Sequence, residues 1–182
     1  MTAIYLLRHG EANYDPVRDR QWPGSMADLA PLSPLGMQQA AAAASQLAGI
    51  GAAALVSSPF TRAMHTASFV AGRLGLIVEV EFGLHEWLPD DTFGWQTHEE
   101  VRAQVDDFNR CGGEWPPGER RPWEPLSSVR QRAAAALRDA VARTSGDGAL
   151  IAVCHETVIR SLTGAAETGT GQFRQISSAA LA

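Results

Sequence analysis

The 182-residue chain contains no lysine, and this absence removes two kinds of chemistry. A phosphate-binding loop of the GxxxxGK[ST] type needs a lysine, and so does catalysis through a Schiff base on the protein. Arginine, histidine and backbone amides must therefore do any binding of phosphate. The sequence also lacks an apolar run of membrane-spanning length, and its first residues lack the pattern of a secretion signal. We expect a cytoplasmic protein.

Cysteine and positive charge are also scarce. Cys111 and Cys154 are far apart in sequence and form no CxxC pair, so we expect two free thiols and neither a disulfide framework nor a zinc finger. The formal net charge of −5 argues against a protein that binds nucleic acid or an anionic membrane by charge. We expect neither as a partner, and the oligomeric state is left open.

The remaining composition is that of an ordinary globular protein. Apolar residues make up 45% of the chain and charged residues 19%. The length is sufficient to bury a core without disulfides or metals. No internal repeat interrupts the pattern, so we predict a single domain over residues 1–182.

Short apolar runs alternate with helical patterns along the chain. The runs that predict strands are 3–7, 53–57, 76–80, 150–154 and 173–181. The stretches that predict helices are 34–47, 60–74, 97–108, 126–143 and 157–162. We expect long loops at 14–32 and 111–125. The alternation predicts a three-layer α/β/α sandwich around a mostly parallel sheet.

Side chains suited to phosphate chemistry follow three of the predicted strands. Arg8 and His9 follow the first strand, Arg62 the second, and His155 the strand at 150–154. Because open α/β sheets bind ligands beyond the carboxyl ends of their strands, we expect these side chains to lie close together. Arginine offers forked donors to phosphate oxygens, and a neutral histidine can attack phosphorus.

Glu86 lies in the loop after the strand at 76–80, next to Trp87. A carboxyl group in a partly desolvated pocket keeps its proton near neutral pH. We therefore predict that His9 forms a phosphorylated intermediate, and that Glu86 protonates the leaving group and then activates water. Each residue alone also has a plain structural interpretation, such as a capping pair, an exposed acid or a hydrogen-bonded histidine. The joint pattern favours catalysis.

The motifs around these residues resemble the histidine phosphatase superfamily, which includes phosphoglycerate mutases and broad-specificity phosphatases. The motifs are LLRHGEA, LSPLGMQQA, SSPFTRAMHTA, LHEW and AVCHETVIRSL, in family order over nearly the whole chain. The resemblance implies a phosphoglycerate mutase-like fold and catalysis without a metal or other cofactor. It also implies His9 as nucleophile and Glu86 as proton donor. The implied phosphate pocket consists of Arg8, Arg62 and His155.

Two positions depart from the family pattern. Members commonly have asparagine six residues after the nucleophile, where this chain has Asp15, with Asn13 two positions earlier. Asp15 would repel a phosphate, so it points elsewhere or Asn13 takes its place. Glu156 follows His155 where glycine is common. It either selects a cationic or hydroxylated substrate or serves as a helix N-terminal acid. Asn13, Asp15 and Glu156 are thus candidates for substrate contact.

These observations predict a phosphomonoesterase that acts on a small phosphorylated metabolite. Hydrolysis is favoured over mutase action because segment 85–123 does not resemble the mutases' substrate segments, which contain tyrosine and lysine. Arg120 and Arg121 keep the mutase alternative open because they could build a basic pocket. A phosphate-binding module without catalysis is disfavoured because all five chemical positions are filled.

Two further features of the chain have alternative interpretations. A metal hydrolase would have to use residues such as His65, His85 and His98, but HEWLP at 85–89 is not an HExxH zinc helix. Trp87, Trp95, Trp115 and Trp123 lie in the middle of the chain. We favour a satellite core for these tryptophans, and the alternative is an apolar lid over the organic part of the substrate.

Overall fold

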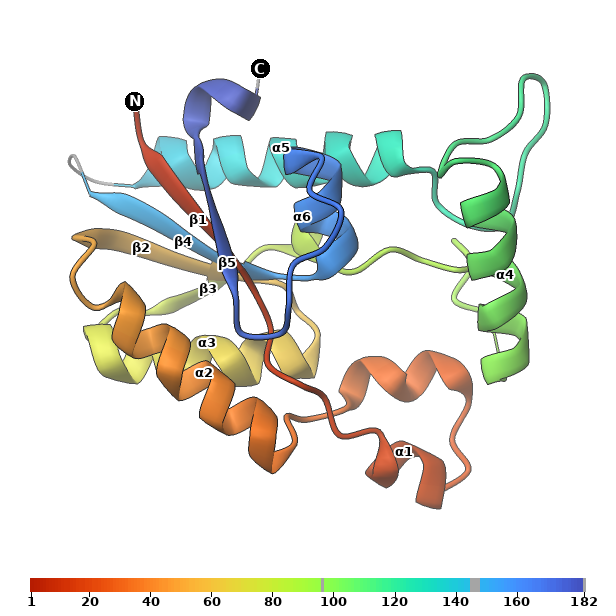
Figure 1. Cartoon of the computed structure of the whole chain (residues 1–182), viewed down its shortest axis with the longest axis horizontal. Helices are drawn as coiled ribbons and strands as arrows, with labels where there is room; N and C mark the ends of the chain where they lie inside the picture. The colour runs from red at the N-terminus through yellow and green to blue at the C-terminus, as the bar shows by residue number, and fades with distance from the viewer. Residues whose placement is uncertain (96, 145–147, 182) are drawn as a thin grey trace.

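A five-stranded sheet in the order β3-β2-β4-β1-β5 forms the centre of the molecule. The computed structural model describes residues 1–95, 97–144 and 148–181 (Figure 1). The strands are β1 (Ala3–Arg8), β2 (Ala52–Ser57), β3 (Val78–Val80), β4 (Ala149–Cys154) and β5 (Phe173–Ser177). Pairs among the first four strands are parallel, and β5 runs antiparallel to β1. The predicted, mostly parallel sheet is confirmed.

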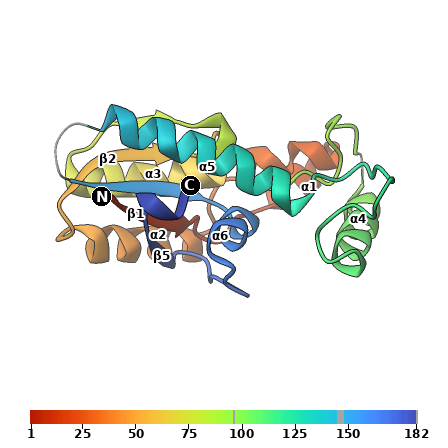
Figure 2. The same ribbon diagram turned by 90° about the horizontal axis from the view of Figure 1, so that it is seen from above.

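Helices cover both faces of this sheet. The α-helices are α1 (Asp15–Asp19), α2 (Pro34–Leu47), α3 (Thr61–Leu74), α4 (His98–Arg110), α5 (Leu126–Arg143) and α6 (Glu156–Thr163). Helices α2 and α3 pack on one face, and α5 and α6 pack on the other (Figure 1). Helix α4 stands apart from the sheet, beyond the carboxyl ends of the strands, in both views (Figure 2). The predicted three-layer sandwich is therefore confirmed.

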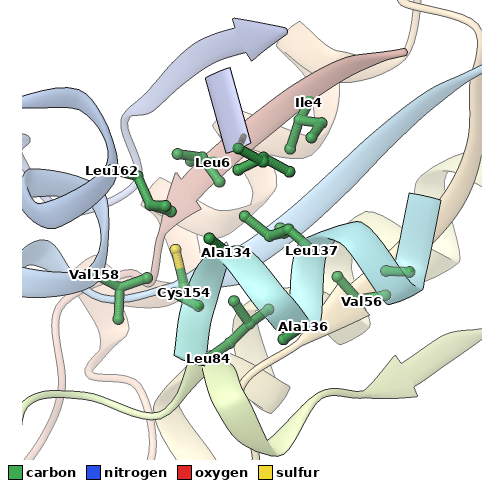
Figure 3. Packing of buried hydrophobic residues seen from close by; sticks show 14 of the residues in the cluster. Ile4, Leu6, Val56, Leu84, Ala134, Ala136, Leu137, Cys154, Val158 and Leu162 are labelled. Carbon is green, nitrogen blue, oxygen red and sulfur yellow. The ribbon is translucent and has the colours of Figure 1, made fainter. Parts of the chain in front are cut away.

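Alternating side chains explain why the sheet can be covered on both sides. Ile4 and Leu6 of β1 pack with Cys154 of β4 in the core beneath α5 and α6 (Figure 3). Leu7 and Val153 belong to the second core, beneath α2 and α3. Successive side chains of a strand point to opposite faces. All residues of β4 are buried, and this explains why the strand appears in the sequence as an unbroken apolar run.

Two predicted elements differ from the structure. The segment 14–32, predicted as a loop, contains α1 and a 3₁₀ helix, Gly24–Leu29. Pro16 lies in the first turn of α1, where its missing N–H costs no helical hydrogen bond. The last predicted strand ends at Ser177 and is followed by a 3₁₀ helix, Ser178–Leu181. Leu181 of that short helix is buried in the core, so composition alone did not separate the helix from the strand.

A close contact between two glycines fixes the direction in which the chain leaves β1. A Cβ atom on Gly10 would lie 2.3 Å from the carbonyl oxygen of Gly36, at the start of α2. A Cβ atom on Gly36 would lie 2.1 Å from the carbonyl oxygen of Glu11. The N–H of Gly36 also donates to Oγ of Ser33, the helix N-cap, at 3.0 Å. The residue just before Gly10, His9, is positioned by this contact.

None of the helices in the described ranges has an apolar stretch long enough to cross a lipid bilayer. Both cysteines are unpaired, as predicted. Cys154 is buried in β4, and Cys111 follows the end of α4.

Candidate active site

His9 is buried at the carboxyl end of β1. Its backbone N–H donates to the carbonyl oxygen of Cys154 at 3.1 Å. Its Nδ1 lies 2.7 Å from the carbonyl oxygen of Gly10, so Nδ1 carries the proton and Nε2 keeps its lone pair, which accepts the N–H of Arg62 Nε. Burial lowers the pKa of His9 to about 3, and the charges of Arg62 and Arg8 add to this effect. The imidazole is therefore neutral and suited to nucleophilic attack.

Arg62, in the first turn of α3, donates a hydrogen bond to the unprotonated ring nitrogen of His9. Its Nε lies 3.3 Å from Nε2 of His9, and its Nη1 lies 3.3 Å from Oδ1 of Asp28. The guanidinium group stands 5.1 Å from the ring centroid of Phe60, and Arg62 as a whole is buried. A desolvated, permanent cation at a helix N-terminus is well suited to an anion such as phosphate.

His155 lies beside His9 and is also buried. The centroids of the two rings are 5.0 Å apart. Nε2 of His155 lies 2.8 Å from Oγ of Ser58, whereas its buried Nδ1 has no hydrogen-bond partner among the described residues. When the Ser58 hydroxyl donates to Nε2, Nδ1 carries the ring proton and can donate it to an oxygen. Burial, assisted by the charge of Arg62, lowers the pKa of His155 well below the ordinary range. One ring nitrogen is therefore free to bind an incoming oxygen.

Ser58 was not identified as a site residue in the sequence analysis. It is fully buried, and its N–H donates to the carbonyl oxygen of Val153 at 2.9 Å. Its hydroxyl group holds the ring of His155 from the loop between β2 and α3. The SSPFTRA motif contains this serine, but a serine before a proline is common in turns, so its sequence context did not distinguish it.

Glu86 lies in the loop after the 3₁₀ helix Phe82–Leu84, on the wall of a cavity that Arg62 and Thr157 also line. Its Oε1 accepts the N–H of Trp87 at 2.8 Å. Burial raises the pKa of Glu86, and the hydrogen bond from Trp87, the charge of Arg62 and contacts with Thr157 oppose this rise. A carboxyl group that keeps its proton in this place can act as a general acid.

Arg132 of α5 anchors the loop that carries Glu86. Its Nη1 donates to the carbonyl oxygens of Gly83 and His85, each at 2.7 Å, and its Nη2 donates to the Glu86 carbonyl oxygen at 3.2 Å. Its Nε and Nη2 bind the carboxylate of Glu124 at 2.6 and 2.8 Å. Arg132 is one of several arginines in an alanine-rich helix, so its sequence context does not distinguish it.

Arg8 is paired with groups of α6 and of the segment before β5. Its Nη1 lies 2.7 Å from Oε2 of Glu156 and donates to the carbonyl oxygen of Thr168 at 2.7 Å. Arg8 is not among the described residues that line the cavity beside Glu86. Its charge still helps to lower the pKa of His9. A role for Arg8 in phosphate binding stays a prediction.

Asp15 and Asn13, the residues considered at the first departure from the family pattern, make local contacts within and before α1. Asp15 is exposed and forms an ion pair with Arg18 within α1. Oδ1 of Asn13 accepts the N–H of Asp15 at 3.0 Å. Neither Asn13 nor Asp15 is among the described residues that line the cavity. Of the two alternatives for Asp15, the structure supports the one in which its side chain points elsewhere.

The histidines considered as metal ligands occupy separate places. Nδ1 of His65 accepts the N–H of Leu32 at 3.3 Å, and His85 is buried with its ring 5.2 Å from that of Phe82. His98 begins α4 and lines the cavity. Within the described part of the chain, no three His, Cys, Asp or Glu residues are grouped so that they could hold a metal ion.

The tryptophans divide between the two interpretations. Trp123 is fully buried, with its ring 5.2 Å from that of Phe108, and Nε1 of Trp115 donates to the carbonyl oxygen of Trp123 at 2.8 Å. These residues form the satellite core. Trp95 and Trp87 line the cavity beside Glu86, as the lid alternative requires, and Trp87 also joins the satellite core, with its ring 5.1 Å from that of Phe108.

The cavity itself has a volume of about 380 Å³. It lies where residues of the 14–29 segment, the Glu86 loop, α4 and α6 meet. Asp28, on the 3₁₀ helix in the first segment, was missed by the sequence analysis because that stretch has no regular apolar period. Burial raises the pKa of Asp28, and its ion pair with Arg62 opposes the rise.

The arginines that kept the mutase alternative open are already paired with acids. Nη2 of Arg120 lies 2.7 Å from Oδ2 of Asp91, and Nη2 of Arg121 lies 2.6 Å from Oε2 of Glu119. Neither arginine is among the described residues of the cavity wall. These two residues therefore do not build a basic pocket next to Glu86.

Known proteins were compared with the whole chain. The family model that describes the histidine phosphatase superfamily (branch 1) matches residues 4–180. No protein in the curated set matches the sequence significantly.

Several solved structures share this fold. A mycobacterial glucosyl-3-phosphoglycerate phosphatase in complex with inorganic phosphate matches with a TM-score of 0.73 and 26% identity, over 97% of this chain and 90% of that one. Bacillus stearothermophilus YhfR matches with a TM-score of 0.73 and 26% identity, over 97% and 91%. Phosphoserine phosphatase from Entamoeba histolytica, at 23% identity, shares the fold with a TM-score of 0.68 over 96% and 90%.

Proposed function

This chain belongs to the histidine phosphatase superfamily, and from that premise we propose that it hydrolyses small phosphate monoesters through a phosphorylated His9. One observation carries the proposal: the unprotonated Nε2 of His9 lies 3.3 Å from Nε of Arg62, which lines the same cavity as Glu86. A nucleophile, a cation for the phosphoryl oxygens and a proton donor thus meet at one place. The motif resemblance in the sequence is confirmed by the family match.

The first step transfers the phosphoryl group to the protein. The lone pair on Nε2 of His9 attacks phosphorus, and an N–P bond forms as the P–O bond to the alcohol breaks. The proton of the Glu86 carboxyl group goes to the departing alcohol oxygen. Arg62 and Nδ1 of His155 bind the phosphoryl oxygens, where negative charge is concentrated.

The second step releases phosphate and restores the site. Glu86, now ionised, accepts a proton from a water molecule that attacks phosphorus, and the N–P bond breaks. His9 regains its lone pair, and inorganic phosphate leaves. Each proton and electron pair in this sequence is carried by a protein side chain, the ester or water, so we propose that hydrolysis needs no metal ion.

Two observations support hydrolysis over mutase action. Arg120 and Arg121 are paired with acids outside the cavity wall, so they do not add the positive charge that would retain a phosphorylated acid between two transfers. In addition, the mycobacterial relative is named as a phosphatase and was solved with inorganic phosphate.

Phosphate release from a panel of monoesters, with a strong chelator present throughout, tests the proposal. The parent protein should release phosphate, and His9→Asn should lose at least about 1,000-fold in kcat. Glu99→Gln, which removes an exposed acid of α4, serves as the matched control and should retain activity. No release from any ester by the parent protein, or full activity of His9→Asn, would contradict the proposal.

The covalent intermediate can be tested separately with Glu86→Gln and 4-nitrophenyl phosphate. The nitrophenolate leaving group needs little help from a proton, so the first step continues while the activation of water is lost. We expect a burst of nitrophenolate equal to the enzyme concentration, together with a phosphate adduct on His9 that is stable in alkali. Isomerisation of a phosphoglycerate pair without free phosphate would favour the mutase instead.

A further inference from the structure

The cavity beside Glu86 has an apolar wall. The apolar side chains that line it come from the Glu86 loop and from α4, and they are Trp87, Leu88, Pro89, Trp95, Val101 and Val105. Its volume of about 380 Å³ falls in the range of sites for small organic molecules. Glu86 lines this cavity and, in the proposed mechanism, protonates the leaving oxygen, so the alcohol half of the ester is expected to occupy this space.

The described residues of the cavity wall offer no spare positive charge to a second anionic group. Two carboxyl groups, those of Asp28 and Glu86, face the cavity, and Arg62 is the one permanent cation among its described lining residues. The guanidinium group of Arg62 is already shared, with Nε toward His9 and Nη1 toward Asp28. The other polar groups of the wall are the hydroxyls of Tyr14 and Thr157 and the ring of His98.

The adjoining hollow does not supply the missing positive charge. It shares Tyr14, Ala27 and His98 with the cavity, and it is also lined by Arg18. Arg18 forms an ion pair with Asp15 on its own helix. Once a phosphoryl group has engaged Arg62, a second anionic group on the substrate would therefore stand in an apolar space next to the carboxylate of Asp28.

We propose that the alcohol half of the substrate is uncharged and largely apolar or aromatic, and that Asp28 excludes alcohols that carry a carboxylate or a second phosphate. This inference rests on the proposed phosphatase function. A carboxylate loses hydration when it enters an apolar cavity, and it is repelled by a like charge. Hydroxyl groups are compatible with the site because Tyr14, Thr157 and His98 can hydrogen-bond to them.

A pair of substrates with the same shape and different charge tests the inference. 4-Carbamoylphenyl phosphate is neutral in its aryl half, whereas 4-carboxyphenyl phosphate carries one negative charge there. The parent protein should favour the carbamoyl ester by about 100-fold in kcat/KM, the size of a like-charge penalty of a few kcal/mol. In Asp28→Asn, the ratio of kcat/KM for the carbamoyl ester to kcat/KM for the carboxy ester should be about tenfold smaller than in the parent protein. This holds whatever the substitution does to the absolute rates.

A control variant and a comparison of ratios test whether the effect belongs to the charge of Asp28. Glu99→Gln removes an acid that is exposed on α4 and is not among the described residues of the cavity wall, so the ratio should stay as in the parent protein. Since each variant acts on the same two leaving groups, any difference in their chemical reactivity cancels when ratios are compared between variants.

Binding without turnover separates this inference from the proposed function. The affinities of 4-carbamoylbenzylphosphonate and 4-carboxybenzylphosphonate, measured by calorimetry with the intact protein, should show the same preference for the neutral compound. Equal or tighter binding of the carboxylate, or an unchanged ratio in Asp28→Asn, overturns the inference while hydrolysis stands. A preference for the neutral phosphonate without hydrolysis of any ester supports the inference and overturns the phosphatase.

Discussion

Oε2 of Glu156 lies 2.7 Å from Nη1 of Arg8, so the acid that follows His155 is paired with the arginine that precedes His9. The contact follows from the alternation of β1, because Leu7 points toward α2 and α3 while Arg8 points toward α6. Both side chains are partly exposed, at 21% and 33%, so solvent screens the pair. Glu156 therefore offsets part of the positive charge near the nucleophile.

Replacing Glu156 with glutamine should strengthen inhibition by inorganic phosphate. The change leaves Arg8 without its acidic partner and makes the surroundings of His9 more positive. We expect the inhibition constant of phosphate to fall about three- to tenfold. A fall of this size corresponds to a partly screened charge–charge interaction of about 1 kcal/mol. The shift should shrink at high salt because screening weakens it further.

The control for this measurement is Asp139→Asn, which removes an exposed acid from α5. A shift of the same size in the control would indicate a general effect of net charge. An inhibition constant in Glu156→Gln equal to that of the parent protein would show that the ion pair does not influence phosphate binding.

Arg132→Lys should lower kcat more than it raises KM. Lysine lacks the planar fork that lets Arg132 bind two carbonyl oxygens of the Glu86 loop and the Glu124 carboxylate at once. We expect kcat on phenyl phosphate to fall about 10- to 100-fold, because a misplaced general acid loses most of its effect. KM should change by less than about threefold, because phosphate is bound elsewhere in the site.

Arg138→Lys is the matched control, since Arg138 lies on the same helix and donates to the carbonyl oxygen of Leu181. The loss in Arg132→Lys should also be smaller with 4-nitrophenyl phosphate, whose leaving group needs little protonation. A uniform loss with both esters would instead indicate general damage to the fold.

The sequence predicted those strands and helices whose own residues carry a clear pattern. The unbroken apolar run of β4 marks a central strand, and the Ser33-Pro34 cap marks the start of α2. The positions of His9 and His155 follow from the general property that parallel strands bring their carboxyl ends to one edge. The sequence therefore predicted that these two histidines lie at the same edge of the sheet.

The residues that the sequence did not reveal depend on contacts between distant segments. Arg132 meets the carbonyl oxygens of a loop 46 to 49 positions earlier, and nothing in its own helix indicates that contact. Asp28 lies in a segment without apolar periodicity, so its ion pair with Arg62 was not visible.

The contribution of Glu86 to kcat/KM should decline as the pH rises. The pKa of His9 is lowered to about 3, so protonation of the nucleophile does not limit activity near neutral pH. The pKa of Glu86 is raised by burial, so its proton is available above the ordinary carboxyl range and is lost at higher pH. Loss of that proton removes the general acid from the free enzyme.

The measurement is the ratio of kcat/KM between the parent protein and Glu86→Gln on phenyl phosphate. Ionisation of the ester affects both proteins equally, so it cancels in the ratio. We expect the ratio to be largest at low pH and to fall through the raised pKa of Glu86. A ratio that does not vary with pH would show that Glu86 does not act through its proton.

Gly10→Ala and Gly72→Ala make the same chemical change in opposite surroundings. A Cβ atom at Gly10 meets the carbonyl oxygen of Gly36 at 2.3 Å, whereas a Cβ atom at Gly72, in α3, has no atom within 4 Å apart from its chain neighbours and the backbone of its own helix turns. Alanine in a helix is favoured over glycine, so Gly72→Ala should raise the free energy of unfolding by about 0.5–1 kcal/mol. Gly10→Ala should lower it by about 1–3 kcal/mol through overpacking.

The two variants also differ in their expected effect on catalysis. The backbone contact at Gly10 sets the position of the neighbouring His9, so relief of the clash in Gly10→Ala has to move the nucleophile relative to Arg62. A displacement of about 1 Å can cost about 100-fold in rate, whereas Gly72→Ala should retain the parent kcat/KM. Urea unfolding and steady-state kinetics check both effects. A stable Gly10→Ala protein with full activity would show that the chain can leave β1 along another path, and that the close contact with Gly36 does not position the nucleophile.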